Sequence, residues 1–249
     1  MIAIFYALEA EIKDLKKGRD LDPLYGRGDC RVSRTRFNRK EILLVSTGVG
    51  KERALDTIKY AMRSYPISTV ISTGFAGALN EKTSAGDVIT ASRMEVECAG
   101  WNERPVVADA RLVAVAQHIQ PGKGFNSLTG TGVTVGEVCA TTAAKRKLCT
   151  EFKADFVDME SYWIGRAAAT GNLPFLIVRA VSDSVQDDLS FIGEITSEGK
   201  VLPGKIIRYF ISHPVDLPRK IGLSAQIAKT GKNLAWFLER LIAQIEPGV

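Results

Sequence analysis

An acidic residue stands at the end of one of the most apolar runs in this sequence. The run FLIV at 175–178 leads directly into RAVSDS at 179–184, so that Asp183 lies between two serines where a buried strand would end. A carboxyl group at such a place can donate or accept a proton during a reaction. The same residues are also a common helix N-cap, because Ser and Asp are favoured there.

Two further strand ends are acidic. ALEAE at 7–11 follows the first apolar run and ends in Glu11, and VDMES at 157–161 contains Glu160. Both glutamates have an ordinary structural interpretation as well. Glu11 could be a surface acid in a first helical turn, where the helix dipole favours negative charge, and Glu160 could be a capping residue.

Two glycine-rich stretches, STGVGKER at 46–53 and STGFAGAL at 72–79, also follow apolar runs. The first is not a P-loop, because Lys51 is followed by Glu52 and the upstream glycine spacing is wrong. In the second, the small residues Ala76 and Gly77 would let the backbone come close to a flat ligand.

Short apolar runs alternate with helical patterns along the chain. The runs lie at 2–7, 41–48, 69–74, 87–92, 132–137, 155–160 and 175–183, and the helical patterns at 51–65, 109–119, 141–152, 160–171 and about 222–245. This alternation predicts an α/β fold, a single-domain three-layer α/β/α sandwich with a central mixed, mostly parallel sheet. No linker interrupts residues 1–249, and ligands of such sheets bind where the strands end.

The composition excludes several classes of protein. The 249 residues are 45% apolar with a net charge of +5, and no apolar run is long enough to span a membrane. The four cysteines form no CxxC pair, which favours a cytoplasmic protein without a metal site. The basic stretch at 27–40 lacks interleaved aromatic residues and the acids are nearly as many as the bases, so we expect no nucleic-acid partner. We also expect no cofactor.

Six motifs, taken in order, resemble those of the purine nucleoside phosphorylase/uridine phosphorylase superfamily, nearest its methylthioadenosine/S-adenosylhomocysteine nucleosidase branch. They are ALEAE at 7–11, STGVGK at 46–51, TGFAGAL at 73–79, GDV at 86–88, VDME at 157–160 and RAVSD at 179–183. The segment that begins at His213 is more similar to the hopanoid-associated phosphorylases of the same superfamily, which are thought to remove adenine from adenosylhopane.

The resemblance implies cleavage of the N-glycosidic bond of a purine nucleoside. Asp183 would protonate N7 of the leaving base, a step worth roughly 10²–10⁴ in rate, and Ser182 would orient it. Glu160 would accept hydrogen bonds from the ribose hydroxyls and Met159 would pack on the sugar. Glu11 matches the glutamate that activates water in the nucleosidases.

Two positions depart from the nucleosidase pattern. Phe75 stands where a serine helps to hold water or phosphate, and a phenyl ring cannot donate a hydrogen bond. Cys139 stands where an aromatic residue stacks on the base, so stacking would be weaker or supplied elsewhere. Arg179, beside the acid, would bind an anion, but arginine occurs there in nucleosidases too.

Three interpretations therefore stay open. The protein is a hydrolytic nucleosidase for an adenine nucleoside, a phosphorylase that uses phosphate in place of water, or a nucleoside-binding member without activity. A phosphorylase would need arginines for phosphate, and Arg27, Arg31, Arg53 and Arg179 are the candidates. Since a neighbouring subunit completes the pocket in many relatives, we expect a homodimer or a higher homo-oligomer.

Overall fold

The computed structural model describes residues 1–28, 30–98, 103–189, 196–197, 200–201 and 217–246. The expectation of one domain over residues 1–249 stays a prediction. The start of the C-terminal segment, residues 213–216, lies outside the described residues.

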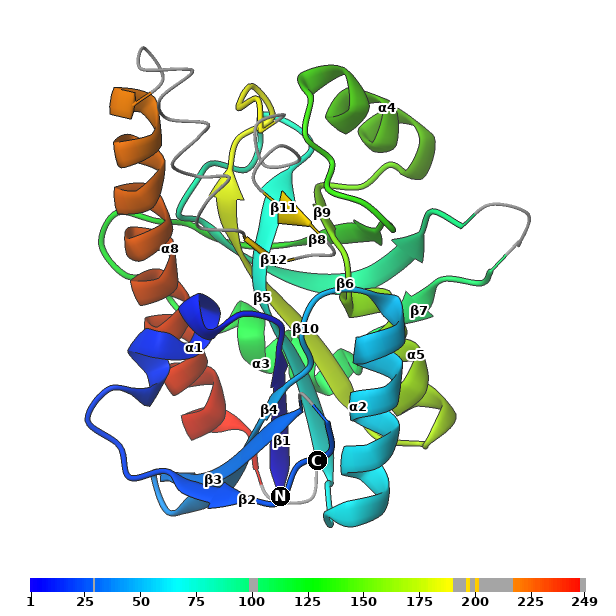
Figure 1. The fold of residues 1–249 in the computed structure, drawn as a ribbon, viewed down its shortest axis with the longest axis vertical. Helices are drawn as coiled ribbons and strands as arrows, with labels where there is room; N and C mark the ends of the chain where they lie inside the picture. Colours follow the sequence, from blue (N-terminus) through cyan, green and yellow to red (C-terminus); the bar gives the residue numbers. More distant parts are fainter. Residues whose placement is uncertain (29, 99–102, 190–195, 198–199, 202–216, 247–249) are drawn as a thin grey trace.

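Four parallel strands form the centre of the sheet (Figure 1). β1 (Ile2–Tyr6) lies between β4 (Lys40–Ser46) and β5 (Thr69–Ala78), and β10 (Phe175–Asp183) pairs with the other side of β5. Nearly all of their residues are buried, as expected for strands covered on both faces. The four apolar runs predicted as strands are confirmed here.

An antiparallel hairpin extends one edge of the sheet. β3 (Arg31–Phe37) pairs with β4, and β2 (Asp22–Leu24) pairs with β3. The basic stretch at 27–40 therefore contains β3, which lies between β4 and β2, and Arg34 of that strand makes an ion pair of 2.7 Å with Asp22. Neither β2 nor β3 was predicted from the sequence.

On the other side, the sheet closes on itself. β6 (Val88–Val96) runs antiparallel to β10 and parallel to β8 (Ser127–Thr134), β8 runs parallel to β9 (Phe156–Asp158), and β9 pairs antiparallel with β5. β7 (Val106–Val107) adds to the free part of β6. The ring β10–β6–β8–β9–β5 was not predicted. It brings the short strand β9, which precedes Glu160, beside the end of β5.

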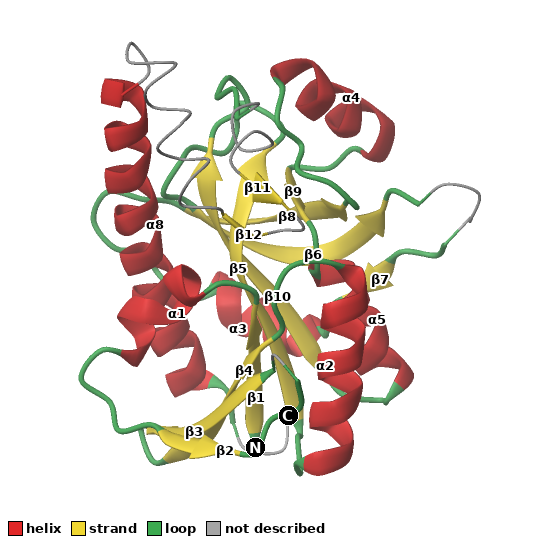
Figure 2. Cartoon of the chain, viewed as in Figure 1, coloured by secondary structure: helices red, strands yellow, loops and turns green. Residues whose placement is uncertain are grey.

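Helices cover both faces of the sheet, as Figure 2 shows. α1 (Glu9–Lys16) packs against α8 (Leu217–Gln244) on one side, and α2 (Lys51–Ser64) packs against α5 (Ser161–Thr170) on the other. α3 (Ala110–Gln117) contacts β6 and α8. α8 begins earlier than the predicted residue 222. None of the described helices combines the length and the apolar character needed to cross a membrane.

α4 (Thr142–Phe152) lies apart from the main core and leads through a short connection into the start of β9. A second, smaller apolar cluster anchors it, formed by Leu79, Val133, Val135, Leu148, Ala154 and Val157. This packing fixes one face of α4 against the strand ends. It thereby fixes the position of Lys145, which is fully buried on the same helix.

Candidate active site

The predicted acids gather where the parallel strands end. In the sheet register Tyr6 lies opposite Ser46, and Gly74 lies opposite Arg179. The residues that follow β1 and β4 therefore come close to the ends of β5 and β10. Ligands of α/β sheets bind at this edge.

Glu11 is a buried residue in the first turn of α1, not the surface acid of the alternative interpretation. One carboxylate oxygen accepts hydrogen bonds from the backbone N–H groups of Ala7 and Leu8, at 2.9 and 2.8 Å. The other accepts from the N–H of Phe75 at 3.1 Å. Burial raises the pKa of Glu11, and the charge of Arg179 and these backbone donors oppose that rise. The bond to the Leu8 N–H also caps the start of the helix.

Gly74 of β5 lies where the start of α1, which follows β1, and the strand β10 both approach β5. A Cβ atom at this position would lie 2.7 Å from Oε1 of Glu11 and 3.0 Å from Nη1 of Arg179. Only glycine fits there without displacing one of them. The carboxylate of Glu11 and the guanidinium of Arg179 therefore face the same point on β5.

Arg179 is buried, and two of its three nitrogens are occupied. Nε donates to Asp158 at 2.7 Å and Nη2 donates to the hydroxyl of Ser72 at 2.9 Å. Asp158 is held in turn by the hydroxyl of Thr134 at 2.6 Å. Nη1 has no hydrogen-bond partner among the described residues. A buried guanidinium nitrogen without a partner is costly, and a bound oxygen atom would satisfy it.

Glu160 occupies the N-cap position of α5 but does not cap it. Its side chain makes no capping bond and instead accepts a hydrogen bond of 2.8 Å from the backbone N–H of Gly50, in the loop after β4. Burial, and next the negative charge of Asp158, raise the pKa of Glu160 to about 8. The glutamate is therefore directed across the strand ends and not along its own helix.

Asp183 ends β10 and is buried in an ion pair that was not predicted from the sequence. Nζ of Lys145 on α4 donates to Oδ2 of Asp183 at 2.6 Å, and the hydroxyl of Ser182 donates to Oδ1 at 2.6 Å. The alternative interpretation of Asp183 as a helix N-cap does not account for these contacts, because its carboxylate binds Lys145 and Ser182. Lysine on an amphipathic helix gives no sequence signal for such a role, because only the packing of α4 turns it inward.

A β-bulge at Ser182 positions the acid. Val181 pairs with Ala76 and Asp183 pairs with the next residue of β5, Gly77, so Ser182 is the extra residue. Its hydroxyl also lies 3.2 Å from the carbonyl oxygen of Ala76. Bulges occur often beside active sites, where they redirect a side chain.

The remaining predicted residues lie around Asp183 or close to Glu160. A Cβ atom at Gly77 would lie 3.0 Å from Oδ2 of Asp183, so this glycine is in close contact with the acid. Cys139 is half-buried near the Lys145–Asp183 pair, and burial raises the pKa of its thiol. Met159 is half-buried between β9 and α5, and its contact with a sugar stays a prediction.

Phe75 contributes its backbone to the site. Its N–H holds Glu11, while its ring packs against the main core and points to α8, where a Cβ atom at Gly231 would lie 3.7 Å from Cζ. The loss of the expected serine therefore removes a hydroxyl but leaves Glu11 bound. Of the other arginines, Arg27 and Arg31 are exposed, and Arg53 lies against Gly48 in the loop after β4.

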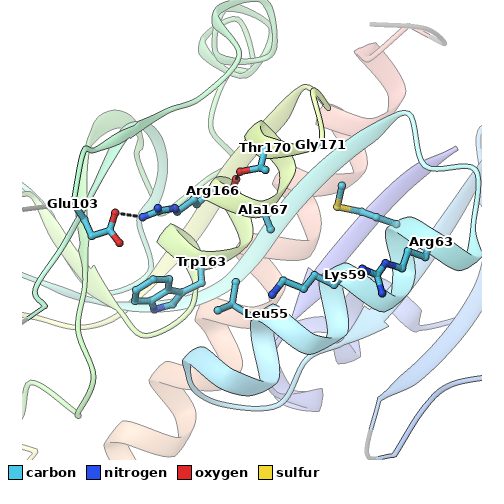
Figure 3. A pocket seen from close by; sticks show the side chains of 10 residues that line it. Leu55, Lys59, Arg63, Glu103, Trp163, Arg166, Ala167, Thr170 and Gly171 are labelled. Carbon is cyan, nitrogen blue, oxygen red and sulfur yellow. Dashed lines mark hydrogen bonds and ion pairs between the residues drawn. The ribbon is translucent and has the colours of Figure 1, made fainter. Parts of the chain in front are cut away.

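A surface pocket opens between α2 and α5 (Figure 3). Leu55, Lys59, Met62, Arg63, Glu103, Trp163, Arg166, Ala167, Thr170 and Gly171 line it. None of the predicted site residues is among them. A pocket is the usual first candidate for a ligand site. The buried titratable groups Glu11, Glu160 and Asp183 lie at the strand ends instead.

The structure is that of an α/β protein with buried carboxyl groups at its strand ends, and comparison with known proteins gives its family. The sequence model of the protein family called Phosphorylase superfamily matches residues 1–212, and the chain belongs to that superfamily. The predicted resemblance is confirmed.

Individual relatives carry nucleosidase names. The chain is 26% identical, over 77% of its length and 90% of the relative's, to the 5'-methylthioadenosine/S-adenosylhomocysteine nucleosidase of Staphylococcus epidermidis. The solved nucleosidase of Neisseria meningitidis has a TM-score of 0.77 at 18% identity, covering 98% of this chain and 99% of that one. Futalosine hydrolase of Helicobacter pylori has a TM-score of 0.75 at 18% identity, covering 98% and 97%. At these identities the two structures establish a shared fold.

Proposed function

We propose that this protein cleaves the N-glycosidic bond of a purine nucleoside, with water as the nucleophile. One observation carries the proposal: three buried carboxyl groups, those of Glu11, Glu160 and Asp183, meet a partly unpaired arginine at the ends of the parallel strands. Gly74 and Gly77 mark the two ends of the site on β5, which at a strand's rise per residue is a span of about 10 Å. That span suits a nucleoside.

Asp183 acts on the base. Protonation at N7 lets the purine leave as a neutral molecule, which removes the penalty of expelling an anion. Ser182 fixes one oxygen of the carboxyl group, and Gly77 leaves room for a flat ring beside it.

Glu160 acts on the sugar. With a pKa of about 8, it carries a proton in much of the ligand-free protein near neutral pH. A carboxyl group can both accept from and donate to neighbouring hydroxyls, as the ribose 2'- and 3'-hydroxyls require. When it ionises in the complex, its charge favours the positive charge that develops on the sugar in the transition state.

Glu11 acts on the nucleophile. Its raised pKa makes it a better proton acceptor than an ordinary carboxylate, and three backbone N–H groups hold it in one orientation. Nη1 of Arg179 can donate to the same water molecule. Water bound between these groups would have an acceptor for its proton and a donor for its oxygen.

Phosphorolysis is the second candidate, and it is favoured by Nη1 of Arg179, which has no partner in the described part of the chain. A phosphate ion there would meet Arg179 but also the carboxylate of Glu11, since both approach the point above Gly74 within 3.0 Å. Two negative groups at that separation repel each other unless one is protonated. This repulsion is why we prefer water.

The names of the relatives suggest the substrate class, an adenine nucleoside with a substituent at the 5' position. The test is to incubate the protein with methylthioadenosine, adenosylhomocysteine, adenosine, inosine and futalosine, each with and without phosphate, and to assay free base and sugar. Free sugar without a phosphate requirement supports hydrolysis. A sugar 1-phosphate supports the phosphorylase, and no release of base under any condition supports a binding protein.

We also propose that the protein is cytoplasmic and works as a homo-oligomer of at least two subunits. All four cysteines are free thiols, which suits a reducing compartment. Light scattering on the purified protein tests the oligomeric state.

A further inference from the structure

Lys145 is a fully buried lysine whose three protons all have acceptors. Nζ donates to Oδ2 of Asp183 at 2.6 Å, to the carbonyl of Ser184 at 2.7 Å and to the carbonyl of Asp187 at 3.0 Å. A buried ammonium group is stable only with such partners. The two carbonyls belong to the turn after β10, so the lysine ties α4 to the acid and to the segment that follows it.

The ion pair conflicts with the simplest picture of Asp183 as an acid. A general acid must carry a proton, yet a carboxylate 2.6 Å from an ammonium group is held in its charged form. The hydroxyl of Ser182 donates a hydrogen bond to Asp183 but is too weak an acid to give its proton away. The transferable proton of the pair therefore lies on Nζ of Lys145.

We infer that Lys145 is the positioning residue of Asp183 and the source of the proton that reaches the purine. The inference rests on the proposed function. A proton moves from Nζ to Oδ2 of Asp183, and the neutral carboxyl group that results gives this proton to N7. The bond from the sugar to N9 breaks and its electron pair moves into the base, which leaves neutral.

The step balances over one turnover. Lys145 is left as a neutral amine, and the attacking water gives its hydroxyl to the sugar and its proton to Glu11. That proton returns through solvent to Lys145, so the protein ends in its starting state. Arginine could hold Asp183 equally well but could not lend a proton, because its guanidinium does not deprotonate in proteins.

The groups around Lys145 agree with this role. Asp183 faces it from β10, and the thiol of Cys139 interacts with both members of the pair. The carboxylate of Asp187 is turned to the N–H and hydroxyl of Ser184, at 2.7 and 2.9 Å, and so leaves Lys145 to Asp183. Asp183 is therefore the only carboxylate that Lys145 contacts among the described residues.

Two substitutions separate proton supply from simple structural support. In Lys145→Arg the cation remains but no proton can be lent, so base release should fall about 10²-fold or more at every pH. In Lys145→Met the carboxyl group keeps its own proton in acid, so activity should survive at low pH and be lost at a lower pH than in the wild type. Lys147→Met, an exposed position on the same helix, is the matched control. A substrate whose leaving group needs no proton, such as para-nitrophenyl riboside, should be cleaved almost equally by all of them.

A measurement without substrate judges the pair independently of the proposed function. Carbon-13 NMR of the aspartate carboxyl carbons, with Asp183 assigned by Asp183→Asn, should show Asp183 ionised at neutral pH in the wild-type protein. A protonated Asp183 in the wild type would overturn the inference even if neither variant folds. Full activity in Lys145→Arg, or an unchanged pH profile in Lys145→Met, would also overturn it. If the wild type releases no base from any nucleoside, the proposed function and the proton transfer fail, while an ionised Asp183 would still show that Lys145 sets its charge.

Discussion

At the scale of single residues, three carboxyl groups close to one another have three different environments. Asp183 faces an ammonium group, Glu11 faces backbone N–H groups, and Glu160 has one N–H donor and the negative charge of Asp158 nearby. Environments that differ in this way allow acids of one type to do different chemistry in one site. In our proposal Asp183 is the proton donor, Glu11 is the proton acceptor and Glu160 is the ligand of the sugar.

Asp183→Asn should lower base release by roughly 10²–10⁴, because an amide has no carboxylic proton to give. It should also destabilise the protein by about 3–5 kcal/mol, since the buried charge of Lys145 loses its counter-ion. Rates of base release and thermal melting measure the two effects. The double variant Asp183→Asn/Lys145→Met removes the unpaired charge and should recover stability without recovering activity. Turnover near the wild-type rate in Asp183→Asn would remove Asp183 from the acid role.

Glu160→Gln should reduce turnover of ribosides more than that of 2'-deoxyribosides. The deoxy substrate lacks the hydroxyl that the carboxyl group would bind, so the substitution should reduce its turnover less. The ratio of kcat/KM for the two substrates, compared between the variant and the wild type, measures this. An equal loss on both would mean that Glu160 does not contact the 2'-hydroxyl.

The raised pKa of Glu160 also predicts how stability depends on pH. The folded protein holds this proton up to about pH 8, whereas an unfolded glutamate loses it near 4.5. Between these values the folded state binds more protons, so the free energy of unfolding should fall as the pH rises, by a few kcal/mol at most. Denaturant unfolding across this range should show a shallower slope in Glu160→Gln. Glu11, whose pKa burial also raises, should keep part of the slope in that variant. An identical slope would contradict the raised pKa.

At the scale of elements, β5 determines how close the acids come. Gly77→Ala would place a methyl group 3.0 Å from Oδ2 of Asp183 and 3.3 Å from Val157, so Asp183 has to shift. We expect kcat for base release to fall clearly, with a smaller change in melting temperature. Gly136→Ala is the control, because a Cβ atom there meets nothing within 4 Å. A normal kcat in Gly77→Ala would show that the acid tolerates displacement.

The sequence predicted the central elements well because their signals are local. The runs at 2–7, 41–48 and 175–183 became β1, β4 and β10, since continuous apolar runs between helices are typical of buried parallel strands. The closure of the sheet through β9 was missed, because two paired residues on a three-residue strand carry no periodic signal.

The site was predicted in part for the same reason. Glu11, Glu160 and Asp183 stand in local motifs and meet at the strand ends. Tertiary packing produces the other contacts of the site, and no residue spacing in the sequence indicates them. These are the contacts of Lys145, the N–H of Gly50 and the bulge at Ser182.

At the scale of the whole molecule, the fold brings Glu11 and Arg179 to one point, and this is the basis of the proposed nucleophile. These residues are far apart in the sequence and approach each other only because β1, β5 and β10 are neighbours in the sheet. Water needs a base to take its proton, whereas phosphate is already an anion and needs cationic donors. A buried glutamate at this point therefore indicates hydrolysis.

Glu11→Gln should abolish hydrolysis, because an amide cannot take a proton from water at neutral pH, while phosphate should not raise the rate of the wild-type protein. The product of the wild type should be the free sugar, identified by mass spectrometry after reaction in ¹⁸O-labelled water. Glu9→Gln is the matched control, since Glu9 lies two residues earlier on the same helix, is exposed, and pairs with Lys16 at 2.8 Å. It should keep its activity. A strict phosphate requirement, a sugar 1-phosphate as product and survival of activity in Glu11→Gln would together replace the hydrolase by the phosphorylase, with Arg179 binding phosphate and Glu11 holding the start of α1.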